Sequence, residues 1–428
     1  MPAKRPNIIF CHVDQLHHEA ISGLGCTDVS TPNIDRIHRE GKSFARAQAS
    51  YPVCSPSRSA WFTGRMPSEN GVIDNGFALL DEMPDLGHWM SARGYDCFYA
   101  GKWHLSRKVD DCFKVLYPQF GLGERNDDDL AQAIESFLQE HQGEKPFFLS
   151  IGFLNPHDCC YLDIPVNDLL TTKLGVESHL DLPPLPPDYN PKLPMASFPK
   201  EAEAKSRNWT PEEVSLYRYY YYRLVERVDA AVGRVYDAVQ NMADAANTLF
   251  IFVSDHGEMM GHRNRFKKFV LYDASLRVPL VFVQPGKIAP GTRDLEHIVG
   301  GVDLTATILD YAGMEMMPEM NFALSARPLI EGTPTKWHTY VPAETTYVGV
   351  QQSFRAGKYK SIYRVDVLSV ELYDTDADPL EQNNLADQPA FASVRQEHDN
   401  YQKDYVSKIK PSPEYLKALA GKKSKTNG

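Results

Sequence analysis

Short runs of apolar, β-branched and aromatic residues alternate with segments of helical periodicity along the first two thirds of the chain. This alternation is typical of an α/β fold in which helices sandwich a large, mostly parallel sheet. The runs predicted to be strands are residues 7–13, 95–100, 147–153, 249–254 and 280–283. The segments predicted to be helices are residues 31–46, 127–141, 212–242 and 304–312.

The pattern changes after about residue 335, where short alternating runs are followed by a helical segment. Such a pattern predicts a small antiparallel sheet with a helix. We therefore expect two units: an α/β domain over residues 1–335, and a C-terminal α+β subdomain over residues 336–428 that ends in a basic tail. The proline-rich residues 158–210 are too long for an ordinary connection and are predicted to be an ordered excursion over the surface.

Composition excludes several classes of protein. The chain has 428 residues, 43% of them hydrophobic, and a formal net charge of -11, which argues against a nucleic-acid partner. No apolar run reaches the roughly 20 residues of a membrane-spanning helix, so no membrane partner is expected. The first residues show no signal peptide, and we expect a cytoplasmic protein, or a periplasmic one if a signal was removed. The seven cysteines fit a reducing compartment.

Residues 53–65, VCSPSRSAWFTGR, predict a short helix with a cysteine at its positive end. Ser55 is predicted to cap this helix, Pro56 to take its first position and Gly64 to end it. A helix N-terminus lowers the pKa of a thiol and favours bound anions, which makes Cys54 a candidate for chemistry. A lone cysteine also fits a small buried core residue, so other residues must decide.

Polar side chains follow four of the five predicted strands. They are Asp14 and Gln15, Lys102 and His104, His157, and Asp255 and His256. Each alone also fits a cap, a turn or a surface histidine. Because the carboxyl ends of parallel strands meet at one edge of a sheet, we expect them to converge. Two carboxylates, an amide oxygen and an imidazole predict a divalent-cation site, and Arg58, Lys102, Lys268 and the two other histidines would surround a tetrahedral oxyanion.

The motif from Cys54 to Arg58, CSPSR, followed by Thr63-Gly64-Arg65, resembles the signature of the formylglycine-dependent sulfatases of the alkaline phosphatase superfamily. The resemblance extends over most of the chain through PNIIFCHVDQ, TPNIDRIHREG, GKWHL, NPH, SDHGEMMGH, KKFVLYDASLRVPL and ELYDTDADPLEQNNLA. It implies an alkaline-phosphatase-like catalytic domain over residues 1–335. It also implies hydrolysis of a sulfate monoester of a carbohydrate or small organic alcohol.

The resemblance further implies how the nucleophile is made. A formylglycine-generating maturation enzyme would oxidise Cys54, and the hydrated aldehyde would attack sulfur. The resulting sulfate ester would collapse by C–O cleavage, which an ordinary serine ester does not do. Arg58 would hold this residue. An unmodified Cys54 thiol with His104 as its base is the alternative.

The resemblance assigns the remaining groups by position. One divalent cation, Ca2+ by preference and Mn2+, Mg2+ or Zn2+ as alternatives, would be held by Asp14, Gln15, Cys54, Asp255 and His256. Lys102 and Lys268 would bind the sulfate oxygens. Lys268 is preferred over Lys267 because it lies five residues before Asp273. His157 would stand near the leaving oxygen, and His104 would take the proton that expels sulfate.

One departure keeps other substrates open. Many sulfatases have a second aspartate where this chain has Gln15, and His256 follows Asp255. Phosphonate monoester hydrolases and phosphodiesterases of the same superfamily share this pattern, so a phosphorus ester is the alternative substrate. A non-catalytic binder of sulfated glycans is a further alternative, although the reacting residues named above are all present.

The alcohol half of the substrate is less determined. Arg263, in the loop GHRNRF, is a candidate ligand for an anionic sugar, as are the pair His17 and His18 and the excursion after His157. Each also fits a solvated surface group. The sequence indicates no oligomeric state.

Overall fold

The computed structural model describes residues 4–141, 143–161, 181–193, 209–347 and 349–423. Its centre is an eight-stranded sheet in the order β4-β3-β5-β1-β6-β7-β2-β8. These strands are β1 (Asn7–Asp14), β2 (Lys42–Phe44), β3 (Asp96–Gly101), β4 (Lys114–Pro118), β5 (Phe147–Pro156), β6 (Thr248–Ser254), β7 (Leu280–Val283) and β8 (Thr292–Asp294). Neighbours pair in parallel except β7, which is antiparallel to both β6 and β2. The predicted mostly parallel sheet is confirmed.

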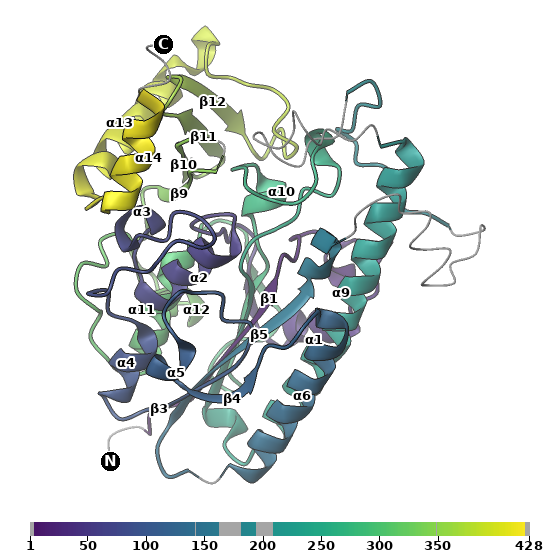
Figure 1. Cartoon of the computed structure of the whole chain (residues 1–428), viewed down its shortest axis with the longest axis vertical. Coiled ribbons are helices and arrows are strands. Elements are labelled where there is room, and N and C mark those ends of the chain that lie inside the picture. Colours follow the sequence, from purple (N-terminus) through teal and green to yellow (C-terminus); the bar gives the residue numbers. More distant parts are fainter. Residues whose placement is uncertain (1–3, 142, 162–180, 194–208, 348, 424–428) are drawn as a thin grey trace.

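Helices cover both faces of this sheet (Figure 1). Alternate residues of β1 belong to different cores: Ile8 and Phe10 pack on one face, and Ile9 and Cys11 on the other. The second face is covered by α1 (Pro32–Glu40), α6 (Gly123–Glu140) and α9 (Pro211–Gln240). The first face carries α2 (Cys54–Thr63), α4 (Leu86–Ser91), α5 (Val109–Cys112), α11 (Gly301–Tyr311) and α12 (Arg327–Ile330). The central strands are therefore buried on both sides, which explains their continuous apolar runs.

The predicted helix over residues 31–46 is wrong in its second half. The helix α1 ends at Glu40, and β2 follows almost at once. Gly41 packs so closely on β7 that a Cβ atom there would lie 2.5 Å from the Phe282 carbonyl oxygen. Pairing of β2 with β7 and β8 therefore overrides the helical periodicity.

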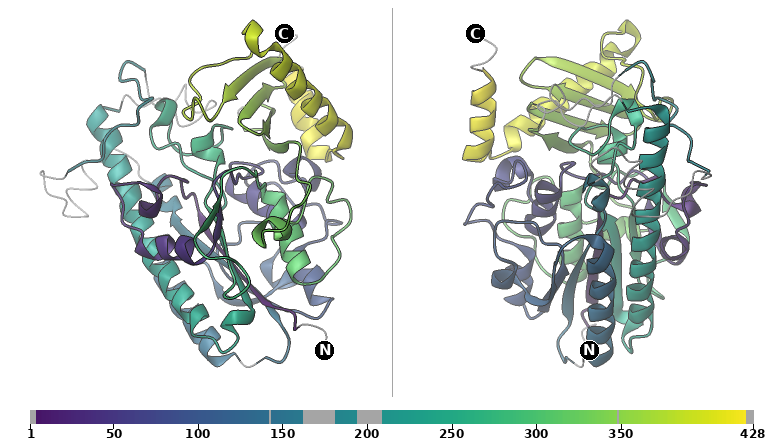
Figure 2. Two further views of the ribbon diagram at one scale, coloured as in Figure 1. Left: turned by 180° about the vertical axis from the view of Figure 1, so that it is seen from behind. Right: turned by 45° about the vertical axis from the view of Figure 1, so that its right-hand side comes forward.

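A second, antiparallel sheet forms the C-terminal part, in the order β12-β11-β10-β9. It comprises β9 (Val341–Thr345), β10 (Gln351–Ala356), β11 (Tyr359–Arg364) and β12 (Ser369–Asp374), followed by α13 (Ala392–Lys408) and α14 (Pro413–Lys423). Figure 2 shows this sheet and its yellow helices at one end of the molecule. The predicted antiparallel sheet with a helix is confirmed, and a second helix is present.

Short elements complete the fold. They are α3 (Pro67–Asn70), α10 (Asp273–Leu276), and the single 3-10 turns η1 (Ser22–Leu24), η2 (His157–Tyr161), η3 (Ala245–Asn247), η4 (His262–Asn264) and η5 (Pro389–Phe391). Asp273 of α10 ties the two sheets together, because Arg355 of β10 and Lys360 of β11 each reach its carboxylate at 2.7 Å.

Two predictions fall largely outside the described residues. Most of the proline-rich excursion, residues 162–180 and 194–208, lies there, as does the end of the basic tail, residues 424–428. Among the described residues, none of the helices combines the length and the apolar composition of a membrane-spanning segment.

Candidate active site

Cys54 is the first residue of α2 and is fully buried. Val53 precedes the helix in an extended conformation, and Gly64 ends it with a left-handed φ of 66°. The predicted cap is therefore wrong: the N-cap is Val53, and Ser55 and Pro56 are the second and third helical residues, each two places further into the helix than predicted. Cys54 still lies at the positive end of the helix, as predicted, beside the first unpaired backbone N–H groups.

Four residues from three elements converge around this thiol. They are Cys54 from α2, Asp14 from the end of β1, and Asp255 and His256, which follow β6. One ligand atom of each lies within 4.8 Å of those of the others, and all four side chains are buried. The Cys54 Sγ is 3.3 Å from His256 Nε2 and 3.6 Å from Asp14 Oδ1. The structure thus brings together the residues at the ends of two neighbouring parallel strands, as the sheet rule predicts.

Arg58 lies one helical turn after Cys54 and neutralises the two carboxylates. Its Nε donates to Asp255 Oδ2 at 3.0 Å, and its Nη2 donates to Asp14 Oδ2 at 3.2 Å. Its Nη1 donates to the backbone carbonyl of Lys102 at 2.7 Å. These three bonds tie the ends of β1, β3 and β6 to α2. They also hold a fully buried guanidinium against two fully buried carboxylates.

Two lysines complete the cationic side of the site. The Lys102 Nζ is 2.6 Å from Asp14 Oδ2. The Lys268 Nζ lies 3.4 Å from the Cys54 Sγ and also donates to the side-chain carbonyl of Gln15. Lys268 is buried whereas Lys267 is half-buried, in agreement with the choice of Lys268 as the site residue.

This distribution of charge changes the proton affinity of the site. Burial and Asp14 raise the pKa of the Cys54 thiol, but Lys102, Lys268 and His256 together hold it well below its ordinary value. The pKa values of the two carboxylates shift in opposite directions. Burial raises the pKa of Asp14, but Lys102, His157 and Arg58 hold it well below the usual range, whereas burial and the Asp14 charge raise the pKa of Asp255. The pocket thus favours an anion at Cys54.

Gln15 is held in a left-handed conformation with a φ of 71°. Its backbone N–H donates to Asp255 Oδ1 at 3.0 Å, and its side-chain Nε2 donates to Glu258 Oε2 at 2.5 Å. The same Nε2 lies 3.3 Å from the Sγ atoms of Cys159 and Cys160. The amide is therefore fixed next to the cluster, with its oxygen facing Lys268.

Glu258 and Cys160 are site residues that the sequence analysis did not single out. The Glu258 carboxylate is fully buried, and besides Gln15 it accepts from the Tyr217 hydroxyl at 2.9 Å. The Cys160 thiol lies 3.9 Å from the Lys268 Nζ. Glu258 stands in the motif SDHGE, two residues after His256, and this proximity was the available signal.

The two remaining predicted histidines differ in position. His157 follows β5 as the first residue of η2, is half-buried, and helps to lower the pKa of Asp14, so it lies near the cluster. His104 is exposed, with a left-handed φ of 60°. It forms no hydrogen bond or ion pair within the described residues. Among the described residues, His104 is therefore not bonded to Cys54, whose imidazole partner is His256.

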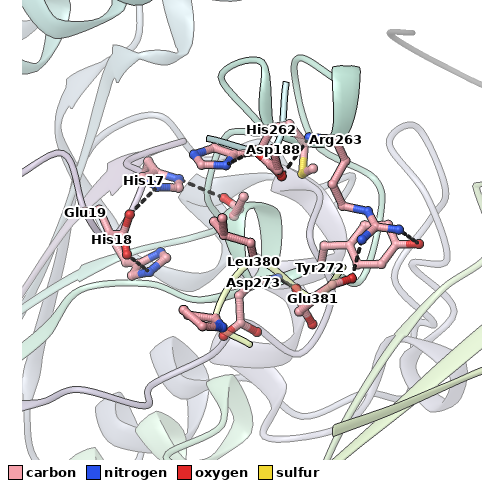
Figure 3. Close-up of a pocket in the computed structure, with 13 residues that line it drawn as sticks. His17, His18, Glu19, Asp188, His262, Arg263, Tyr272, Asp273, Leu380 and Glu381 are labelled. Carbon is pink, nitrogen blue, oxygen red and sulfur yellow. Dashed lines mark hydrogen bonds and ion pairs between the residues drawn. The ribbon is translucent and has the colours of Figure 1, made fainter. Parts of the chain in front are cut away.

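Arg263 lies away from the cluster, against the C-terminal subdomain. Its guanidinium stacks on the Tyr272 ring at 4.0 Å from the ring centre, and its Nη1 donates to the backbone carbonyl of Glu381. With His17 and His18 it lines a separate cavity (Figure 3). Arg263 is therefore held by Tyr272 and Glu381 and does not lie beside Cys54.

Comparisons with known proteins agree with this geometry. A family model described as Sulfatase matches residues 6–314, and one described as N-sulphoglucosamine sulphohydrolase, C-terminal, matches residues 261–406. The chain is 26% identical to a Delta 4,5-hexuronate-2-O-sulfatase of Bacteroides thetaiotaomicron, over 97% of this chain and 92% of that protein. It is similar to the solved structure of a 2-O GAG sulfatase, with a TM-score of 0.79 and 25% identity over 94% of this chain and 92% of the other.

The likeness in fold also extends to a phosphonate monoester hydrolase of Agrobacterium radiobacter. That structure has a TM-score of 0.73 and 21% identity, over 94% of this chain and 95% of the other. The sulfatase model alone matches well over half of the chain. The chain therefore belongs to the sulfatase family of the alkaline phosphatase superfamily and is a sulfuric ester hydrolase.

Proposed function

We propose that the protein hydrolyses the sulfate monoester of a carbohydrate or small organic alcohol, with a nucleophile made by oxidation of Cys54 to formylglycine. The observation that carries this proposal is the surroundings of Cys54. It lies at the N-terminus of a fully buried helix, in the CSPSR motif, with Lys102, Lys268 and the Asp14–Asp255–His256 group around it. Cations on several sides would balance the negative charge of a tetrahedral group bound there.

The modified residue would supply a hydrated aldehyde, one of whose hydroxyls is the nucleophile while the other regenerates the aldehyde. Because Cys54 is fully buried in the folded chain, we propose that the maturation enzyme modifies it before α2 packs. Arg58 fixes the first turn of α2 against β1 and β6, which holds residue 54 in place.

The donor set fits one divalent cation. Two buried carboxylates, Asp14 and Asp255, supply hard oxygens, with Gln15 adjoining them. The His256 Nδ1 is 2.9 Å from the backbone carbonyl of Gly257, which leaves its Nε2 to face the cluster. Since oxygens predominate, Ca2+ is the proposed ion, with Mn2+, Mg2+ or Zn2+ as alternatives. When bound, the ion lowers the pKa of the nucleophilic hydroxyl and offsets charge on the ester.

The chain's own cations bind the ester. Lys102 pairs with Asp14, and Lys268 donates to Gln15. Both lysines are proposed to hold the sulfate oxygens. His157 is proposed to protonate the leaving oxygen. His104 is proposed to accept the proton that expels sulfate.

A phosphorus ester is the second candidate. Gln15 and His256 give the site less negative charge than two further carboxylates would, and Gln15 contacts Lys268 directly. The test is the rate of hydrolysis of paired aryl sulfate, phosphonate monoester and phosphate diester substrates by protein co-produced with a formylglycine-generating enzyme, beside Cys54→Ala.

Dominant sulfate hydrolysis that Cys54→Ala abolishes supports the proposal. Faster turnover of the phosphorus esters would favour the second candidate. Tight binding of sulfated glycans with no turnover of any substrate, in protein shown to carry formylglycine, would favour a binding protein.

A further inference from the structure

Three residues that directly follow Gln15 lie at a second cluster of metal-ligating side chains. His17, His18 and Glu19 border a small cavity, of about 20 Å³, between the loop after β1, the loop around η4 and the C-terminal subdomain (Figure 3). None of Cys54, Lys102 and Lys268 lines this cavity. It is therefore separate from the reacting centre.

The orientation of His17 is fixed by the backbone. Its Nδ1 lies 3.0 Å from the carbonyl oxygen of Glu258 and 3.1 Å from that of Ala274. Two carbonyl acceptors require a proton on Nδ1, so the lone pair of the neutral ring is on Nε2. That atom is 3.9 Å from Glu19 Oε2. A histidine whose other nitrogen donates to a carbonyl is the usual form of a metal ligand.

His18 approaches the same carboxylate from the other side. Its Nε2 is 3.5 Å from Glu19 Oε1, and its ring centre is 4.7 Å from that of His17. Figure 3 shows the Glu19 carboxylate between the two rings. The three ligand atoms lie within 4.8 Å of one another. Ligand atoms of tetrahedral zinc lie roughly 3.3–3.6 Å apart, so small side-chain shifts bring all three onto one ion.

The cluster is also accessible to a cation. Asp188, Asp273 and Glu381 line the same cavity, but Asp188 pairs with His262 and the other two pair with Lys360. The Arg277 guanidinium interacts with Glu19, so the charge offered to an ion is that of the Glu19 carboxylate. The side chain of Glu19 is 66% exposed, which leaves an entry path. A further imidazole adjoins, because His262 stacks on His17 with ring centres 5.7 Å apart. Its Nδ1 is 2.9 Å from Asp188 Oδ1.

We propose that His17, His18 and Glu19 form a second metal site, which binds Zn2+ or a similar transition-metal ion and presents its fourth position to the cavity. Two imidazoles and one carboxylate suit such ions better than Ca2+, whereas the oxygen-rich cluster at Asp14 has the opposite preference. Glu258 connects the two sites, since its backbone carbonyl faces His17 and its carboxylate holds Gln15. An ion at this site would therefore fix the loop that carries Gln15.

The test uses metal binding, so it is independent of the proposed hydrolysis. Chelator-treated protein is supplied with excess Ca2+ and then titrated with Co2+, whose visible absorption reports tetrahedral coordination. Zn2+ is used as the competitor. We expect about one equivalent of Co2+ to bind with nitrogen and oxygen ligands, Zn2+ to displace it, and Glu19→Gln to weaken binding by at least about 100-fold. Glu19 is exposed, so this variant should fold, and His18→Gln should act in the same direction.

His88→Gln is the matched control, because His88 belongs to the other described group of metal-ligating residues outside the reacting centre, with Asp85 and Cys112. It should leave Co2+ binding unchanged. Binding that survives Glu19→Gln, binding lost in His88→Gln, an absorption band of thiolate-bound Co2+, or no Co2+ binding by the wild type would each overturn the proposal.

Discussion

Lys268 and Lys267 are adjacent in the chain but have different surroundings, and this difference tests the proposed sulfate contact. We expect Lys268→Met to lower kcat/KM for an aryl sulfate by about 100- to 1,000-fold, because a cation next to the developing charge is lost. Lys267→Met is the matched control and should keep kcat/KM near the wild-type value. Equal losses in the two variants would contradict the assignment of Lys268.

Arg58 is predicted to stabilise the folded protein in addition to its place in the site. Replacing it by methionine leaves the Asp14 and Asp255 carboxylates buried without their shared partner. We expect the free energy of unfolding, measured with denaturant in the presence of a chelator, to fall by about 3–5 kcal/mol. Arg93→Met, which removes a partly exposed ion pair, should cost no more than about 1–2 kcal/mol. Similar losses in both variants would argue against the buried network.

The members of the site were predictable where a sequence rule applied. Asp14 and Asp255 follow apolar strands, and Cys54 and Arg58 stand one turn apart in a recognisable motif. The contacts of Gln15 were not predictable, because they join it to residues 243 and 145 positions away, Glu258 and Cys160. No local pattern encodes such a pair.

At the scale of elements, the end of α2 depends on Gly64. A Cβ atom there would lie 2.5 Å from the Met320 side chain, in a backbone conformation that favours glycine. We expect Gly64→Ala to lower the free energy of unfolding by about 2 kcal/mol or more. Gly121→Ala is a close control, since its φ of 65° matches but nothing lies within 4 Å. Gly121→Ala should cost about 1 kcal/mol. Equal costs in the two variants would show that the contact with Met320 adds nothing to the destabilisation.

Elements were predictable to different degrees for a physical reason. The strands β1, β5 and β6 are buried on both faces, so each is a nearly continuous apolar run, interrupted within the strand by His12 in β1 and Ser150 in β5. The strands β2 and β8, at one side of the sheet, have three residues each and exist through pairing with distant segments. Their sequence carries no period, and a helix was predicted over β2. Helix α9 is the opposite case, because 30 residues of consistent periodicity leave little ambiguity.

At the scale of the whole molecule, a buried carboxyl joins the C-terminal subdomain to the α/β domain. Glu344 of β9 accepts from the Tyr405 hydroxyl at 2.7 Å and from the backbone N–H of Ser68. Burial raises the pKa of Glu344 to about 7, from 4.5 in the unfolded chain. The folded protein thus binds this proton more tightly. Its contribution to stability is greatest below about pH 4.5 and decreases as the pH rises toward 7.

We therefore expect Glu344→Gln to become stabilising relative to the wild type as the pH rises. The free energy of unfolding of the variant minus that of the wild type should increase by about 3 kcal/mol from pH 4.5 to pH 7.5. Thermal unfolding across this range provides the measurement, with Glu296→Gln at an exposed position as the control. A difference that does not change with pH would show that Glu344 titrates normally.

In the proposed reaction, formylglycine at position 54 performs the chemistry. The most direct measurement produces the protein with graded amounts of the formylglycine-generating enzyme. The converted fraction of the Cys54 peptide is determined by mass spectrometry, and the rate of aryl sulfate hydrolysis is determined on the same samples. We predict that the rate rises in proportion to the converted fraction and extrapolates to zero at no conversion. A rate that is independent of conversion would show that another group is the nucleophile.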